Sequence, residues 1–121
     1  MVKKVLIVED KLAIIDLTER IIKGLGMGLE TRVATNVEKA LDVLNSGDIG
    51  LMLLDYNLEI GTKKETTDLV ARAAYGLEVP FIFTSDDEVV YLKLEGYGAI
   101  RHLPKPFNLD DLENEIKKFY S

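Results

Sequence analysis

At residues 49–55 the chain reads IGLMLLD, a stretch that is apolar at nearly every position and ends on a carboxylate. An uninterrupted apolar run of this length is typical of a strand that is covered on both faces, as in a parallel sheet. A carboxylate that ends so apolar a strand is expected to serve a purpose other than solubility. The stretch therefore predicts a buried strand that carries a functional side chain, Asp55, at its carboxyl end.

Four further apolar runs lie on either side of this stretch, and helical periodicity fills most of the segments between them. The runs cover residues 5–8, 31–34, 79–84 and 99–103. Apolar residues recur at helical spacing over 14–25, 37–44, 69–77 and 109–119, and 86–95 is expected to be helical from its position alone. The alternation predicts an α/β fold, in which a doubly wound five-stranded parallel sheet lies between two helical layers as a (βα)5 flavodoxin-like sandwich. We expect residues 1–121 to form a single domain.

Composition and charge exclude several classes of protein. Of the 121 residues, 47% are hydrophobic and 30% are charged, which is enough apolar surface for a globular core. The net charge of −6 is spread over both halves without a basic cluster, so direct nucleic-acid binding is not expected. The chain has no Cys, which excludes disulfides and thiolate chemistry, and no apolar run long enough for a signal peptide or a bilayer span. We therefore expect a cytoplasmic protein that does not contact a membrane.

Polar side chains stand where the predicted strands end, and ligands of such sheets bind beyond the carboxyl ends of the strands. The residues at these ends are Glu9, Asp10, Asp55, Thr84, Ser85 and Lys105. Three carboxylates that meet without a cation repel one another, and a bound divalent cation relieves that repulsion. Oxygen ligands of this kind suit Mg²⁺ better than a transition metal. The sequence thus predicts a magnesium site with an ammonium group and a hydroxyl beside it.

Each of these features also has an ordinary structural explanation. An acidic pair such as Glu9 and Asp10 favours the start of a helix, a single lysine is usually a solvated surface residue, and Thr84 or Ser85 can cap a helix. The combination of all of them at the ends of successive strands is far more specific than any one of them.

Three motifs resemble those of the receiver domains of two-component response regulators, the CheY-like superfamily. They are IVED at 7–10, LLD at 53–55 and GAIRHLPKPF at 98–107, and the resemblance extends over the whole chain. It implies that Asp55 accepts a phosphoryl group from a sensor histidine kinase or a phosphotransfer protein. Lys105 would pair with the phosphoryl group, and Mg²⁺ would be held by Glu9, Asp10, Asp55 and the backbone carbonyl of Asn57. The chain would then be a phospho-acceptor rather than an enzyme, although it would promote its own phosphorylation and dephosphorylation.

The resemblance also implies a switch that starts from a hydroxyl at the end of the fourth strand. Counting from Pro80 places Ser85 at the family position and Thr84 one residue before it. Because neighbouring strand residues face opposite ways, only one of the two can reach the phosphoryl group, and we choose Ser85. Asp86 then stands beside the site, where its charge is expected to weaken phosphorylation or shorten its lifetime. His102 occupies a position that is commonly Tyr or Phe, and would enter the space that the hydroxyl leaves. The signal would appear on the face formed by the fourth helix, the fifth strand and the last helix.

Other functions remain open from the sequence. The main alternative is a receiver-like interaction module that works without phosphorylation, and Asp86 keeps it open. A phosphohydrolase of the haloacid-dehalogenase type would need a second Asp at the position of Asn57, and flavin binding would need a Ser, Thr or Gly loop in place of Glu9 and Asp10. The sequence does not identify the downstream partner protein, and we expect a monomer or a phosphorylation-dependent dimer.

Overall fold

The computed structural model describes residues 3–56, 58, 64–85, 94–105 and 107–121. The strands are β1 (Lys3–Val8), β2 (Leu29–Ala34), β3 (Ile49–Asp55), β4 (Phe81–Ser85) and β5 (Ala99–Pro104). The helices are α1 (Leu12–Gly24), α2 (Val37–Asn45), α3 (Lys64–Gly76) and α5 (Leu109–Tyr120). All strand pairs are parallel, in the order β2-β1-β3-β4-β5, which confirms the predicted fold class. The helix expected over 86–95 falls mostly outside the described residues.

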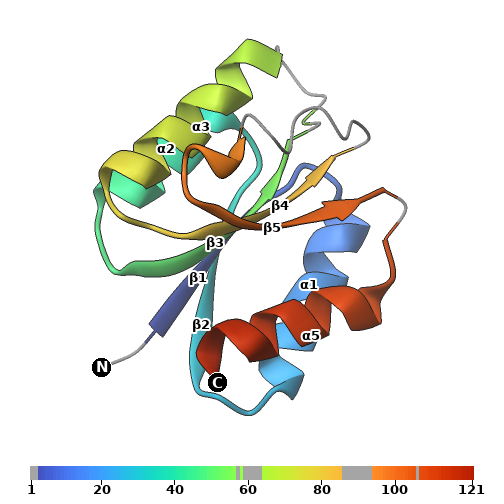
Figure 1. Cartoon of the computed structure of the whole chain (residues 1–121). Helices are drawn as coiled ribbons and strands as arrows, with labels where there is room; N and C mark the ends of the chain where they lie inside the picture. The colour runs from blue at the N-terminus through green and yellow to red at the C-terminus, as the bar shows by residue number, and fades with distance from the viewer. Residues whose placement is uncertain (1–2, 57, 59–63, 86–93, 106) are drawn as a thin grey trace.

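Two helical layers enclose the sheet, with α2 and α3 on one face and α1 and α5 on the other (Figure 1). Alternate residues of each central strand supply the two cores. The α2/α3 core contains Leu6, Val8, Met52, Leu54, Phe81, Phe83, Val70 and Ala74. The α1/α5 core contains Val5, Ile7, Leu51, Leu53, Ile82, Leu103, Leu112 and Ile116. Strands buried on both faces explain the uninterrupted apolar runs from which they were predicted. Within the described residues, no helix is both long and apolar enough to cross a membrane.

Local signals in the sequence set several ends of these elements. The side chain of Asn36 caps α2 by accepting a 2.8 Å hydrogen bond from the N–H of Lys39. The predicted cap Asn108 starts α5 in the same way, through a 2.8 Å bond from the N–H of Asp110. Gly47 follows α2 with a φ of +83°, a conformation that an L side chain rarely adopts. These signals fix where the helices stop and where the next strand enters the sheet.

Three elements begin at other residues than predicted, and in β2 and α3 the reason is that polar residues interrupt the apolar pattern. β2 begins at Leu29 rather than residue 31, because this edge strand alternates between half-buried and exposed residues and shows no continuous apolar run. α3 begins at Lys64 rather than residue 69, because its first turns carry polar residues. β4 begins at Phe81 rather than residue 79 and continues to Ser85.

Candidate functional site

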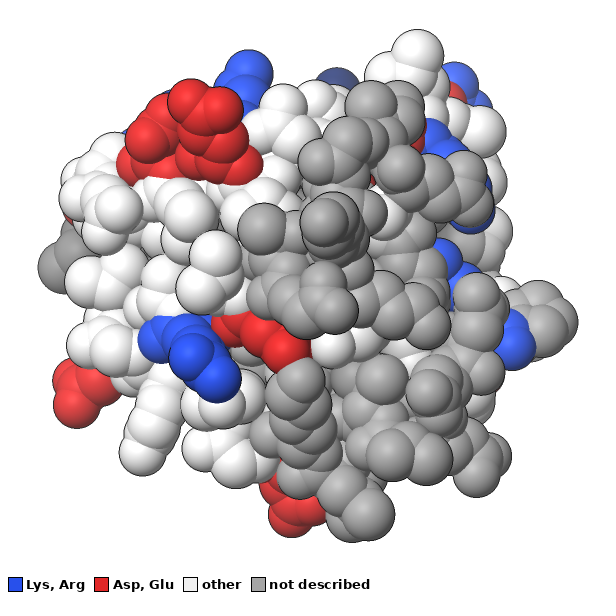
Figure 2. Space-filling model, turned by 90° about the horizontal axis from the view of Figure 1, so that it is seen from above, with Lys and Arg blue, Asp and Glu red and all other residues white. Residues whose placement is uncertain are grey.

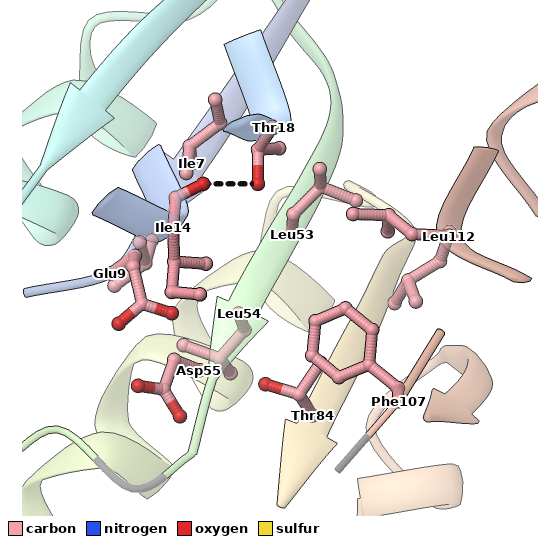
Figure 3. A pocket seen from close by; sticks show the side chains of 12 residues that line it. Ile7, Glu9, Ile14, Thr18, Leu53, Leu54, Asp55, Thr84, Phe107 and Leu112 are labelled. Atoms are coloured by element: carbon pink, nitrogen blue, oxygen red, sulfur yellow. Dashed lines mark hydrogen bonds between the residues drawn. The ribbon is translucent and has the colours of Figure 1, made fainter. Parts of the chain in front are cut away.

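Three carboxylates meet where β1 and β3 end. Glu9 and Asp10 follow β1, and Asp55 is the last residue of β3, the neighbouring strand in the sheet. Each residue offers one oxygen, and these oxygens all lie within 4.8 Å of one another. Glu9 is 7% exposed and Asp55 is 3% exposed, whereas Asp10 is half-buried. Figure 3 shows the carboxylates of Glu9 and Asp55 side by side at the mouth of a small cavity. The structure thus brings together the three acidic residues that the sequence singled out.

Burial and the neighbouring charge of Asp55 change the protonation of Glu9. Desolvation, followed by the charge of Asp55, raises the pKa of Glu9 from 4.5 to about 7. Two groups lower this pKa, namely the N–H of Lys11, which donates to Glu9 Oε1 at 3.2 Å, and the charge of Lys105. The N–H of Asp10 donates to the same oxygen at 3.1 Å. The net increase means that the neutral form of Glu9 is favoured more than in an exposed glutamate, and that a cation bound beside it would favour the charged form.

Lys105 supplies positive charge from β5's carboxyl end. Its Nζ donates a 2.7 Å hydrogen bond to Asp55 Oδ1, and the Lys105 side chain is 19% exposed. The backbone N–H of Lys105 also donates to the carbonyl of Ser85 at 3.0 Å, which holds this segment against the end of β4. On the face seen in Figure 2, basic and acidic side chains adjoin each other beside the grey residues, and the described part of that face shows no continuous basic patch. The lysine is therefore positioned to meet an anion that reaches Asp55.

The two hydroxyl residues at the end of β4 lie on opposite faces of the sheet. Ser85 is fully buried, and its Oγ lies 3.2 Å from Nε2 of His102. The His102 ring stacks on Phe83, with centroids 4.6 Å apart and planes inclined by 17°, which places this pair on the α2/α3 side. Thr84 is the register partner of Asp55 and lies with it on the α1/α5 side. Of the two hydroxyls, Thr84 thus shares the sheet face of Asp55, and Ser85 contacts His102.

A cavity of about 30 Å³ lies beneath the carboxylates, between the sheet and the helices α1 and α5 (Figure 3). Its lining includes Glu9, Asp55, Thr84, Thr18 and Phe107. Thr18 uses its own hydroxyl locally, because Oγ1 donates to the carbonyl of Ile14 at 2.7 Å. The cavity has room for about one water molecule.

Comparison with known proteins identifies the family. The response regulator receiver domain family matches residues 5–117, nearly the whole chain. The chain belongs to this family. The match spans all three motifs on which the resemblance was based. These motifs supply the carboxylates and the lysine that the structure brings together.

Two curated relatives resemble this receiver domain along almost all of its length. It is 28% identical over 125 residues to transcriptional regulatory protein CrdR of Helicobacter pylori, covering 100% of this chain and 56% of the relative. It is 29% identical over 129 residues to sporulation initiation phosphotransferase F of Bacillus subtilis, covering 98% of this chain and 94% of the relative. The chain therefore spans a little over half the length of the first relative and nearly all of the second.

Solved structures agree with the fold. A CheY-like receiver domain protein of Methanospirillum hungatei superposes with a TM-score of 0.82 at 24% identity, covering 98% of this chain and 93% of that one. A receiver domain of Bermanella marisrubri gives a TM-score of 0.80 at 22% identity, with 100% of both chains covered. At these identities the likeness concerns the fold.

The carboxylate cluster of this receiver domain fits a hard divalent cation. Carboxylate oxygens are the ligands that Mg²⁺ prefers, and three are available within 4.8 Å of one another. Glu9, Asp10 and Asp55 are the described residues that would hold such an ion. Asn57, predicted as a backbone ligand, and Asp86, predicted as a neighbouring charge, lie outside the described residues.

One buried polar pair next to the cluster was not predicted from the sequence. The hydroxyl of Tyr56 donates a 2.8 Å hydrogen bond to Oδ1 of Asp68 in α3, and both residues are buried. Asp68 lies three residues before Ala71, on the buried side of the helix. Had the helical periodicity been extended towards the polar start of α3, Asp68 would have appeared as a charged residue on a buried face.

Proposed function

We propose that this receiver domain accepts a phosphoryl group on Asp55 from a phosphohistidine of a sensor histidine kinase or phosphotransfer protein, with Mg²⁺ as cofactor. The observation that carries the proposal is the convergence of Glu9, Asp10 and Asp55, with Lys105 Nζ at 2.7 Å from Asp55. Lys105, half-buried just beyond the end of β5, places a cation beside the three carboxylates. A site for an anionic phosphoryl group needs both, because carboxylates alone would repel the donor.

The residues have separate roles in the proposed transfer. Asp55 is the nucleophile, so that one of its carboxylate oxygens forms the bond to phosphorus while the bond to the donor imidazole nitrogen breaks, and that nitrogen leaves with the electron pair. Lys105 attracts the phosphoryl oxygens and neutralises charge that builds up on them. Glu9 and Asp10, with Asp55, would hold Mg²⁺, which supplies further positive charge when bound.

The proposed readout begins at Ser85. Its hydroxyl contacts His102 on the sheet face opposite Asp55. A phosphoryl group on Asp55 would extend beyond the end of the strand and offer this hydroxyl, at the same edge of the sheet, a stronger, charged acceptor. A hydroxyl that turns towards the phosphoryl group releases His102, which is free to move into the space left behind. Because His102 lies in β5, the change reaches the surface formed by β5, α5 and the segment before β5, and shifts the population of its conformations.

The partners follow from this chemistry. The donor carries a phosphohistidine, and the phosphorylated chain is read by a partner protein that the sequence leaves unidentified. The role proposed is that of a cytoplasmic phospho-acceptor, not of an enzyme acting on free substrates. The likeness to sporulation initiation phosphotransferase F, whose length the chain nearly spans, supports a place in phosphoryl transfer between proteins.

The test is incubation with acetyl phosphate and Mg²⁺, followed by measurement of the intact mass. We expect one phosphoryl group on the wild type and none on Asp55→Asn, which removes the nucleophile with almost no change in volume. A wild type that stays unlabelled by acetyl phosphate and by phosphohistidine donors would contradict the proposal and support the phosphorylation-independent interaction module. Rapid release of free phosphate without an accumulating adduct would favour a phosphohydrolase.

A further inference from the structure

Tyr56 directly follows the proposed acceptor and is held at three points. Its backbone N–H donates to the carbonyl of Thr84 at 2.9 Å, which extends the pairing of β3 and β4 one residue beyond Asp55. Its ring is 4% exposed and belongs to the α2/α3 core. Its hydroxyl donates a 2.8 Å hydrogen bond to Oδ1 of Asp68. The residue next to the nucleophile is therefore tied to a strand, a core and a helix.

Asp68 is an unfavourable residue for the place that it occupies. It is 6% exposed, on the side of α3 that faces the sheet. Burying a carboxylate is costly, and apolar residues of similar volume would fill the same space without that cost. A short hydrogen bond between a rigid phenol and a helix residue does fix how the end of β3 is placed relative to α3.

The direction of Asp55 depends on that placement. Alternation along β3 sends Asp55 to the α1/α5 side and Tyr56 to the α2/α3 side, so that a rotation of one side chain about the strand rotates the other. Small displacements of a reacting group are known to cost large factors in rate. We infer that Tyr56 and Asp68 are positioning residues, whose hydrogen bond holds the carboxylate of Asp55 in line for phosphoryl transfer. This inference rests on the proposed function of Asp55.

The test compares rates of phosphorylation by acetyl phosphate in the full chain. Tyr56→Phe removes only the hydroxyl, and we expect the maximal labelling rate to fall about tenfold while the half-saturating donor concentration stays unchanged. Asp68→Leu, which removes the acceptor, is expected to show the same loss. Asp68→Asn keeps an amide oxygen that accepts the same hydrogen bond, so its rate is expected to stay within about twofold of the wild type.

Val70→Ala is the matched control, because Val70 is fully buried in α3 and makes no part of the Tyr56–Asp68 bond. Val70→Ala destabilises the same helix. Its labelling rate is compared with that of Tyr56→Phe at temperatures equally far below the melting temperature of each variant. If Tyr56→Phe is labelled as fast as the wild type, or if Val70→Ala is slowed equally, the positioning role is wrong and the proposed function of Asp55 still stands. A wild type that is not labelled on Asp55 would overturn the proposed function, and the inference with it.

Discussion

The Nζ of Lys105 lies 2.7 Å from Oδ1 of Asp55, although 50 residues separate the two in the sequence. The Asp55 side chain is 1% exposed and that of Lys105 is 19% exposed, so water contributes little to the solvation of either charge. In such a pair each ion depends on the other, and removal of one leaves an uncompensated charge. This relationship joins the last strand to the third at the point where the chemistry is proposed.

Lys105→Met is expected to destabilise the metal-free chain by about 3 kcal/mol, because it leaves the carboxylates without their cation. Urea denaturation in the presence of EDTA measures this effect. Lys23→Met is the control, because Lys23 is an exposed lysine in the last turn of α1 and its replacement removes the same net charge. An equal effect of the two substitutions would mean that net charge, and not the specific pair, is responsible. Adding Asp55→Asn to Lys105→Met should restore part of the lost stability.

Mg²⁺ is expected to raise the melting temperature, and Asp10→Asn should largely abolish the increase. A ligand at about one hundred times its Kd stabilises a protein by about 2.7 kcal/mol, a readily measured change. Asp16→Asn serves as the control, because Asp16 is an exposed residue of α1 that pairs with Arg20 and is not part of the cluster. If wild type, Asp10→Asn and Asp16→Asn respond alike to Mg²⁺, the proposed site is wrong.

In the absence of divalent cations, stability is expected to fall as the pH rises from about 4.5 to 7. Glu9 has its pKa raised from 4.5 to about 7 in the folded state, so over this range the folded chain binds more protons than the unfolded chain. The contribution of this group is therefore fully present below pH 4.5 and lost as the pH passes 7. Glu9→Gln should show a flatter profile, since an amide does not titrate. Denaturation in EDTA at several pH values compares the two, and parallel profiles would contradict the assignment to Glu9.

Ser85→Ala is expected to accept a phosphoryl group yet show a weaker response of the His102 ring resonances to phosphorylation. The bond between Ser85 Oγ and His102 Nε2, 3.2 Å in the structure, is the proposed link between the site and β5. Thr84→Ala should leave the response nearly intact, because Thr84 lies on the opposite face of the sheet. Uncoupling by Thr84→Ala with a silent Ser85→Ala would instead assign the switch to the hydroxyl that shares a face with Asp55.

Glu78→Gly is expected to stabilise the fold by about 1 kcal/mol. Glu78 lies just after α3 with a φ of 59°, the left-handed conformation that costs residues with a Cβ about 1 kcal/mol and costs glycine almost nothing. Thermal melting measures the gain. Glu78→Ala removes the same charge but keeps the Cβ, so a comparable gain in that variant would point to charge and not to backbone strain.

The sequence predicted the fold because β1, β3 and β4 are buried on both faces, so that their apolar runs are visible without any structure. It also predicted the carboxylate cluster, since carboxyl ends of parallel strands share one edge of a sheet. β2 was harder to delimit, because an edge strand needs only one apolar face. Its first residues, from Leu29, alternate in burial and gave no continuous signal.

Contacts between distant side chains could not be predicted in the same way. Alternation shows that Thr84 and Ser85 face opposite ways, but only the register of β3 against β4 shows which of them shares a face with Asp55. The link between Tyr56 and Asp68 likewise depends on how α3 is turned against the sheet. Such relationships arise from packing between elements, and the local pattern of each element does not contain them.

The strand order β2-β1-β3-β4-β5 has a consequence for a chain that is still being synthesised. The first three strands are neighbours in the sheet, so the segment up to Asp55 can pair with itself before the rest has left the ribosome. That segment already holds Glu9, Asp10 and Asp55, whereas Lys105 arrives only with the last strand. A nascent chain can thus gather the carboxylates but lacks the ammonium group that balances them. On the chemistry proposed here, a growing chain becomes able to accept a phosphoryl group only after the segment that carries Lys105 has been synthesised.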